Sequence, residues 1–180
     1  MQTLETTRLI LRDLALTDLD DFYFYASNKE VATSSGWLPH KSKEESLEIL
    51  TRLVNNHDNY AIVNKADNKM IGTVGVHNYS LDFQISNKKQ LCLGYSLNKD
   101  YWSRGLMTEA LLAVIDHCFS DLEVDILWAS HVDNNKYSLK LLEQIGFVFT
   151  HRYYKTTSDH NKTYEALAYT YKREDYYARD

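Results

Sequence analysis

Residues that break or cross-link a chain are scarce here: the 180-residue sequence has six glycines, one proline and two cysteines. So little glycine and proline excludes collagen-like, low-complexity and linker-rich chains. Two cysteines are too few for a disulfide scaffold, so we expect buried free thiols at Cys92 and Cys118. No apolar run is long enough to span a membrane, and the N-terminus lacks the apolar core of a secretory signal. We therefore expect a single cytoplasmic domain over residues 1–180.

Positive charge is not in excess, because the formal net charge is −5. This argues against direct, nonspecific binding to nucleic acid, which requires a basic surface, and suits a cationic acceptor such as an amine. Fourteen tyrosines are present, and seven lie near the C-terminus: Tyr153, Tyr154, Tyr164, Tyr169, Tyr171, Tyr176 and Tyr177. Strand packing explains these tyrosines most simply. A platform for stacking bases is the alternative, but carboxylates balance the few cations of this segment.

The hydrophobic pattern alternates between strand and helix periods along the chain. It predicts strands at 8–14, 60–63, 70–79, 91–97, 124–131, 147–154 and 164–171. It predicts helices capped by Thr17 and by Ser42, a third after Arg104, and a fourth from about Asn134 to Gly146. The segment 34–40 carries the only proline and is expected to be a loop. The strand–helix–strand unit at 91–131 requires a parallel, right-handed crossover, so we predict an α+β fold with a mixed sheet.

The stretch from Leu91 to Leu112 is the most informative part of the sequence. Its strand-like alternation passes through a polar turn into a helix whose start contains Arg104 and Gly105. The first amides of a helix lack acceptors, and the helix dipole adds partial positive charge. A glycine there lets a phosphate group approach the backbone, so this junction is a candidate anion site.

A second candidate feature follows the strand at 124–131. Asn135 and Ser138 are spaced i, i+3, which places both polar side chains on one face of the helix start. The alternative is that Asp133 or Asn134 caps this helix and Ser138 has no role.

Together these two features resemble the GNAT superfamily of acetyl-CoA-dependent N-acyltransferases. The superfamily's phosphate-loop pattern, Arg/Gln-x-x-Gly-x-Gly/Ala, falls on Trp102-Ser-Arg-Gly-Leu-Met107, where Gly105 matches and Trp102 and Met107 depart. These departures are similar to those in Rim-type acetyltransferases, the subgroup that modifies the N-termini of ribosomal proteins. The Asn-x-x-Ser…Gly-Phe spacing is met by Asn135, Ser138 and Gly146-Phe147.

The resemblance implies a mostly antiparallel sheet with a central, splayed parallel strand pair, 91–97 and 124–131, flanked by about four helices. It also implies acetyl-CoA as the acyl donor, with no metal. Backbone groups near Tyr95 and Leu97 would pair with the pantetheine, and the first-turn amides would hold the pyrophosphate. The implied donor-binding residues are Tyr95, Leu97, Ser103, Arg104, Gly105, Leu106, Met107, Thr108, Asn135 and Ser138. The side chain of Arg104 either adds charge there or points to solvent.

The reaction implied by the resemblance is direct attack of a neutral primary amine on the thioester. Many members use a tyrosine as the acid for the leaving thiolate, but this sequence has Leu142 at that position, so Ser138 is the catalytic candidate. In relatives, the loop that corresponds to 34–40 borders the acceptor site, so Trp37 and His40 are candidate substrate-binding residues. His77, at a strand end near the expected thioester slot, is a third.

No strong general base is evident in the sequence. Glu109 is expected to be a helix-surface residue, and His131 a packed or solvent-facing one. A weak base favours an amine of low pKa, so the acceptor implied is the N-terminal α-amine of a protein or peptide.

Three other functions remain open. One is acetylation of a small amine such as a polyamine, a drug or an amino-acid derivative. Another is a non-catalytic acyl-CoA-binding module. The absence of the tyrosine acid and of an evident base is consistent with such a module. A third, RNA binding through the tyrosine-rich end, requires more positive charge than the segment has. Rim-type relatives are monomers or dimers, so a homodimer is possible.

Overall fold

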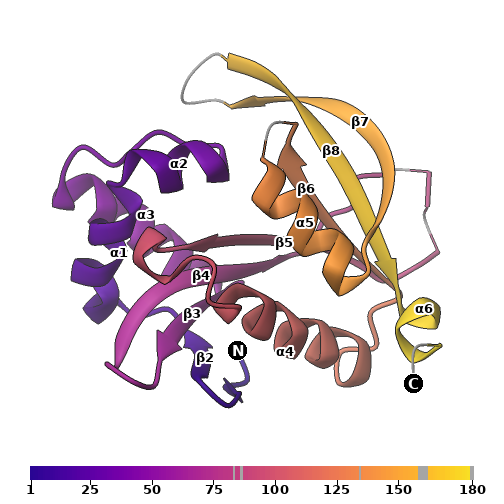
Figure 1. Cartoon of the computed structure of the whole chain (residues 1–180), viewed down its shortest axis with the longest axis horizontal. Coiled ribbons are helices and arrows are strands. Elements are labelled where there is room, and N and C mark those ends of the chain that lie inside the picture. The colour runs from indigo at the N-terminus through magenta and orange to yellow at the C-terminus, as the bar shows by residue number, and fades with distance from the viewer. Residues whose placement is uncertain (83, 86, 134, 158–161, 179–180) are drawn as a thin grey trace. The chain divides into compact units, whose positions relative to one another are not determined.

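The computed structural model describes residues 1–82, 84–85, 87–133, 135–157 and 162–178, with the elements labelled in Figure 1. These residues form two compact units, each assembled from two separate stretches of chain. The first unit contains 1–76 and 95–114, and the second contains 77–94 and 115–180. Strand β5 and helix α4 contribute residues to both units.

Strands of the first unit form successive hydrogen-bonded neighbours in the order β1-β2-β3-β4-β5. Their bounds are β1 Leu4–Glu5, β2 Leu9–Asp13, β3 Asn59–Asn64, β4 Lys69–His77 and β5 Gln90–Leu97. Pairing from β1 to β4 is antiparallel, which confirms the predicted hairpin at 60–79. Strand β5 passes so close to β4 that a Cβ on Gly72 would lie 2.3 Å from the Ser96 carbonyl oxygen.

Helices of the first unit are α1 Leu19–Ala26, α2 Lys29–Ser35, α3 Lys43–Asn56 and the first residues of α4 Leu106–Ser120, with 3₁₀ turns η1 Leu16–Asp18 and η2 Lys99–Tyr101. Ser42 caps α3 as predicted, because its hydroxyl accepts the Glu45 amide at 3.2 Å. The prediction of Thr17 as a cap is wrong. Asp18 precedes α1, and its buried carboxylate accepts the Ala15 amide at 2.9 Å and pairs with Arg12.

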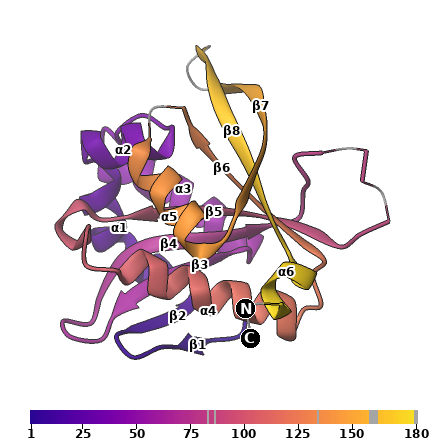
Figure 2. The ribbon, with the colours of Figure 1, turned by 45° about the vertical axis from the view of Figure 1, so that its right-hand side comes forward.

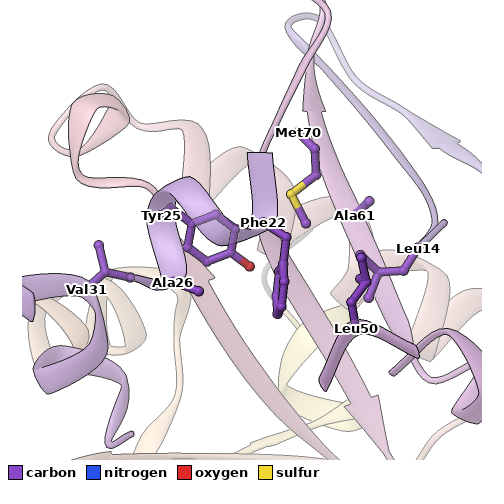
Figure 3. Packing of buried hydrophobic residues seen from close by; sticks show 8 residues of the cluster. All are labelled: Leu14, Phe22, Tyr25, Ala26, Val31, Leu50, Ala61 and Met70. Carbon is purple, nitrogen blue, oxygen red and sulfur yellow. The ribbon is translucent and has the colours of Figure 1, made fainter. Parts of the chain in front are cut away.

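Apolar side chains of α1, α2 and α3 meet those of the strands in one core cluster (Figure 3). The cluster comprises Leu14, Phe22, Tyr25, Ala26, Val31, Leu50, Ala61 and Met70. Phe22 and Tyr25 make an edge-to-face contact, with ring centroids 5.6 Å apart. Two indole rings, Trp37 and Trp102, pack against this cluster from its margin.

The second unit contains the parallel pair that the sequence predicts. Residues Gln90–Leu93 of β5 pair in parallel with Ile126–Ala129 of β6, which runs Ile126–Val132. Both strands continue past this four-residue pairing, β5 to Leu97 and β6 to Val132. Strands β7 Val148–Thr157 and β8 Lys162–Lys172 form a long twisted hairpin (Figure 2), and β8 pairs antiparallel with β6.

Two helices complete the second unit: α5 Lys136–Ile145 and α6 Arg173–Tyr177. Helix α5 ends as predicted at Gly146, whose φ of 116° only glycine adopts readily. Its predicted start at Asn134 lies outside the described residues, and the helix is described from Lys136. At the end of α4, Phe119 contacts the rings of Tyr171 and Tyr176, so these C-terminal tyrosines pack within the fold.

The observed architecture confirms the predicted α+β class, with a mixed sheet and one parallel pair. The described residues contain six α-helices instead of about four. The additional helices, α2 and α6, have seven and five residues, too few to display a helical hydrophobic period. Within the described ranges, no helix is both long and apolar enough to cross a bilayer.

Candidate functional site

The polar turn before α4 has the backbone geometry of an anion-binding loop. Ser103 has φ of +59° and Gly105 has φ of +71°, whereas the residue between them is not in the positive region. Alternation of this kind turns successive amide groups toward one side of a loop. The loop ends at Leu106, where α4 begins. The first amides of a helix have no acceptor within the helix, so the turn places such amides at the positive end of a helix dipole.

A side chain from the start of the chain supports this loop. Arg8 donates through Nη1 to the Arg104 carbonyl oxygen at 2.8 Å and through Nε to Glu109 Oε2 at 2.6 Å. Glu109 Oε1 also accepts the Thr6 hydroxyl at 2.6 Å and the Arg8 amide at 2.8 Å. Glu109 is thus a partly exposed residue, 19% exposed, whose carboxylate is occupied by Thr6 and Arg8.

The charge state of Glu109 follows from these contacts. Partial burial would raise the pKa of its carboxyl group. The hydrogen bonds from Thr6 and Arg8, together with the Arg8 charge, outweigh burial and hold this pKa below its usual range. Glu109 is therefore ionised at neutral pH and able to hold the guanidinium in one orientation.

Arg104 itself lies over an aromatic ring. Its guanidinium carbon is 5.4 Å from the centroid of Tyr101, a cation–π contact. The Tyr101 hydroxyl donates to the carboxylate of Asp67, which raises the pKa of Tyr101 to about 12. The sequence left two alternatives for the Arg104 side chain: added charge at the loop or a position in solvent. The contact with Tyr101 was not predicted.

The end of β5 leads directly into the loop. Tyr95 is half-buried and Leu97 is buried, and the Leu97 carbonyl accepts the Trp102 indole N–H at 2.7 Å. Trp102 therefore ties the loop start to the strand, which gives a structural reason for its departure from the superfamily pattern. Ser96 lies between Tyr95 and Leu97 in the sequence, and its hydroxyl is 3.1 Å from the Thr73 hydroxyl on β4.

In the second unit, Asn135 and Ser138 are joined by a capping contact. The Asn135 side-chain Oδ1 accepts the Ser138 amide at 3.0 Å, so Asn135 is the N-cap of α5. This excludes Asp133 as that cap, and Asp133 instead pairs with Arg152 at 3.3 Å. Ser138 is 6% exposed, so its hydroxyl lies in a mostly dry environment.

The two histidines predicted near the acceptor have different surroundings. His40 bonds through Nδ1 to the Ser46 hydroxyl at 2.7 Å and contacts the Phe22 ring. Burial lowers the pKa of His40, although the Glu45 charge opposes this. His77 ends β4 and stacks on Tyr79, and its Nε2 would lie 3.5 Å from a Cβ on Gly94.

Of the two expectations for His131, packed or solvent-facing, the structure shows the first, because His131 is buried. Its Nδ1 lies 2.8 Å from the Val132 carbonyl, so Nδ1 carries a proton. Its Nε2 lies 3.2 Å from the Tyr169 hydroxyl, which then donates to it. Both ring nitrogens of His131 therefore have hydrogen-bond partners within the fold.

Trp37, the third residue predicted near the acceptor, packs against the core cluster. Its indole N–H is buried and has no acceptor among the described residues. A buried donor without an acceptor costs about 1–3 kcal/mol, so this position carries a stability cost.

Neither thiol is suited to act as a nucleophile. Burial raises the pKa of Cys92, and burial raises the pKa of Cys118 to about 12. Both thiols are free and buried, as predicted, and stay protonated at neutral pH. Across the described residues, no three His, Cys, Asp or Glu side chains gather in a way that could hold a metal ion.

Comparison with known proteins identifies the family. The sequence matches the family described as Acetyltransferase (GNAT) domain over residues 8–148. This match covers most of the chain, so the protein belongs to the GNAT acetyltransferase family. The matched segment ends at Val148, the first residue of β7, so it includes both the loop before α4 and the Asn135–Ser138 cap.

Relatives agree with this assignment. An "Uncharacterized N-acetyltransferase p20" of Bacillus licheniformis is 28% identical over 153 residues, which cover 82% of this chain and 83% of that protein. A GCN5-related N-acetyltransferase from Brucella melitensis has a TM-score of 0.85 at 16% identity, covering 98% of this chain and 81% of that one. A ribosomal-protein-S5-alanine acetyltransferase from Vibrio fischeri has a TM-score of 0.76 at 23% identity, covering 97% and 98%. At these identities the two structures show a shared fold.

The protein is therefore a GNAT N-acetyltransferase, and its fold implies acetyl-CoA as co-substrate. The loop before α4 fits an anionic donor, because it combines positive φ at Gly105 with first-turn amides that have no acceptor within the helix. Sequence reasoning missed Arg8 at this loop. Only the three-dimensional contact with Glu109, 101 residues away, reveals it.

Proposed function

We propose that this GNAT enzyme acetylates the N-terminal α-amine of a protein or peptide, by direct attack of the neutral amine on the acetyl-CoA thioester. The observation that carries the proposal is the state of the candidate bases and nucleophiles. His131 is bonded at both ring nitrogens, Glu109 is held by Arg8, and the two thiols stay protonated.

Backbone groups at the end of β5 and of the loop, all within the first unit, would hold the donor. First-turn amides and Gly105 suit the pyrophosphate, while strand edges suit the amides of pantetheine. The proposed donor-binding residues are Tyr95, Leu97, Ser103, Arg104, Gly105, Leu106, Met107, Thr108, Asn135 and Ser138.

Ser138 is proposed to assist departure of the thiolate by donating a hydrogen bond to the sulfur. Leu142 occupies the position where many relatives carry a tyrosine acid, and it is buried and cannot donate. A hydroxyl is a weak acid, but a thiolate whose conjugate thiol has a pKa of about 8.5 needs little assistance to leave.

The acceptor follows from the pKa of the amine. At pH 7, roughly one-tenth of an α-amine with a pKa of about 8 is neutral. For a lysine side chain with a pKa of about 10.4, the neutral fraction is only ~10⁻⁴–10⁻³. An enzyme with a weak base therefore acts faster on the α-amine. Trp37, His40 and His77 are proposed to border the acceptor.

A ribosomal-protein acceptor of the Rim type is the finer form of this proposal. Two observations support it: the Trp102 and Met107 departures from the superfamily loop pattern, and the fold shared with the Vibrio fischeri enzyme, which is named for a ribosomal-protein alanine. The free, buried thiols suit the reducing cytoplasm. A single domain over 1–180 and a homodimer stay predictions, which limited proteolysis and light scattering test.

Thiol release from acetyl-CoA tests the proposal when it is measured with three acceptors: short peptides with varied N-terminal residues and blocked lysines, free polyamines, and Nα-blocked lysine. We expect turnover on peptide N-termini to exceed that on lysine by at least tenfold. Preference for polyamines would support a small-amine enzyme. Stabilisation by CoA without thiol release from any acceptor would indicate a non-catalytic module.

A further inference from the structure

We propose that Arg8 is a donor-binding residue that acts on the phosphates of coenzyme A, held in place by Glu109. This inference rests on the proposed donor site. It assigns a role to the residue immediately before β2, which the loop motif does not include. The contacts between Arg8, Glu109 and the loop all lie within the first unit.

Three of the five guanidinium N–H groups of Arg8 lie on two nitrogens that already have partners. Nε donates to Glu109, and Nη1 donates to the carbonyl of Arg104 inside the loop. These two contacts fix the plane of the guanidinium. A surface arginine without such contacts has no fixed plane. The bond to the Arg104 carbonyl also stabilises the loop conformation that turns the neighbouring amides toward one side.

Nη2, the third nitrogen, lies 3.5 Å from where a Cβ on Gly105 would be, so it borders the open space beside this glycine. The hydrogen bonds observed from the guanidinium to described residues leave from Nε and Nη1. The Arg8 side chain is 47% exposed, so a ligand can reach it. An oriented, accessible guanidinium N–H beside an amide-lined loop is suited to phosphate oxygens.

Glu109 makes this orientation possible. Its carboxylate accepts from Thr6 and from both the amide and the side chain of Arg8, so the strand start and the helix start are tied together. An arginine without that carboxylate would keep its charge but lose its fixed direction. Glu109 and Thr6 are therefore positioning residues, while Arg8 contacts the ligand.

Calorimetric titration with CoA and dephospho-CoA, on wild type and four variants, tests the inference. Arg8→Ala is expected to lower the affinity for both ligands by about 10–100-fold, the range for a lost charge-assisted hydrogen bond. Arg8→Lys should restore part of this loss, since it keeps charge without the fork. Glu109→Gln should fall between wild type and Arg8→Ala. Arg52→Ala, which removes an exposed arginine of α3, is the matched control and should bind as wild type.

A donor without phosphates separates binding from folding. With S-acetylpantetheine, kcat/KM of Arg8→Ala should stay within about twofold of wild type, while kcat/KM with acetyl-CoA falls. An equal loss with both donors, or unchanged affinity for CoA, would overturn the role of Arg8. If wild type neither binds CoA nor releases thiol, the proposed function fails before any variant is compared.

Discussion

Asn135 caps the helix that carries Ser138: its side-chain oxygen accepts the Ser138 amide at 3.0 Å. The i, i+3 spacing that marks this pair in the sequence is thus first a folding feature, because it satisfies an orphan donor at the start of α5. The same contact sets the position of the Ser138 backbone. Any catalytic role of Ser138 therefore depends on Asn135 through the helix start.

Replacing Asn135 by alanine should cost about 1 kcal/mol of stability, the usual loss for a helix cap. For a chain of this size that is roughly 2–4 °C in Tm. Asn135→Asp keeps an acceptor oxygen and should retain most of the stability. Thermal unfolding without ligand is the measurement, and an unchanged Tm in Asn135→Ala would mean that the cap contributes nothing.

Ser138→Ala should lower kcat by about 10–100-fold while the Kd for CoA changes less than about twofold, because the hydroxyl is proposed to contact the donor at the sulfur, where negative charge develops as the thiolate leaves. Ser120→Ala, at the end of α4, is the matched control. Steady-state kinetics combined with calorimetry separates the two quantities. Loss of CoA affinity with unchanged kcat would make Ser138 a binding residue and remove it from the chemistry.

Gly105→Ala should destabilise the fold by about 1–2 kcal/mol, because an L-residue is strained at a φ of +71°. The new Cβ would be in ordinary contact with Arg8 Nη2 at 3.5 Å, so backbone strain is the cause. Gly94→Ala is a close comparison, with the same 3.5 Å approach to His77 but without positive φ. Only Gly105→Ala should weaken CoA binding. Equal Tm values for the two variants would contradict this explanation.

Stability should fall as the pH decreases below about 6.5, in part through His40. Burial holds the folded-state pKa of His40 below that of the unfolded chain. Between these two pKa values the unfolded state binds more protons, so the free energy of unfolding decreases as pH falls through this window and levels off below it. His40→Gln should show a smaller decrease in Tm between pH 7.5 and 5.5 than wild type. An identical decrease would exclude His40 as a contributor.

Most regular elements could be predicted from the sequence, because long strands and helices have clear hydrophobic periods. The stripe that begins at Leu106 predicted α4, and Gly146 marked the end of α5. The cap before α1 was harder to place. Thr17 suits a cap by residue type, but Asp18 stands at the N-cap position of α1, and its carboxylate makes no cap bond because it accepts the Ala15 amide and pairs with Arg12.

The candidate site was only partly predictable. Backbone features such as Gly105 are visible locally, because a glycine at a strand–helix junction has few other roles. Contacts between distant residues leave no local pattern. Nothing near Arg8 in the sequence indicates Glu109, and nothing near Trp102 indicates that its indole binds the Leu97 carbonyl.

One peptide with a free N-terminus and one unblocked lysine tests the central claim most directly. After incubation with enzyme and acetyl-CoA at pH 7, mass spectrometric sequencing locates the acetyl group. The proposed mechanism predicts acetylation of the α-amine, with the lysine modified at least tenfold more slowly, because far less of its ε-amine is neutral. Acetyl groups on the lysine at an equal or greater rate would contradict an α-amine acetyltransferase.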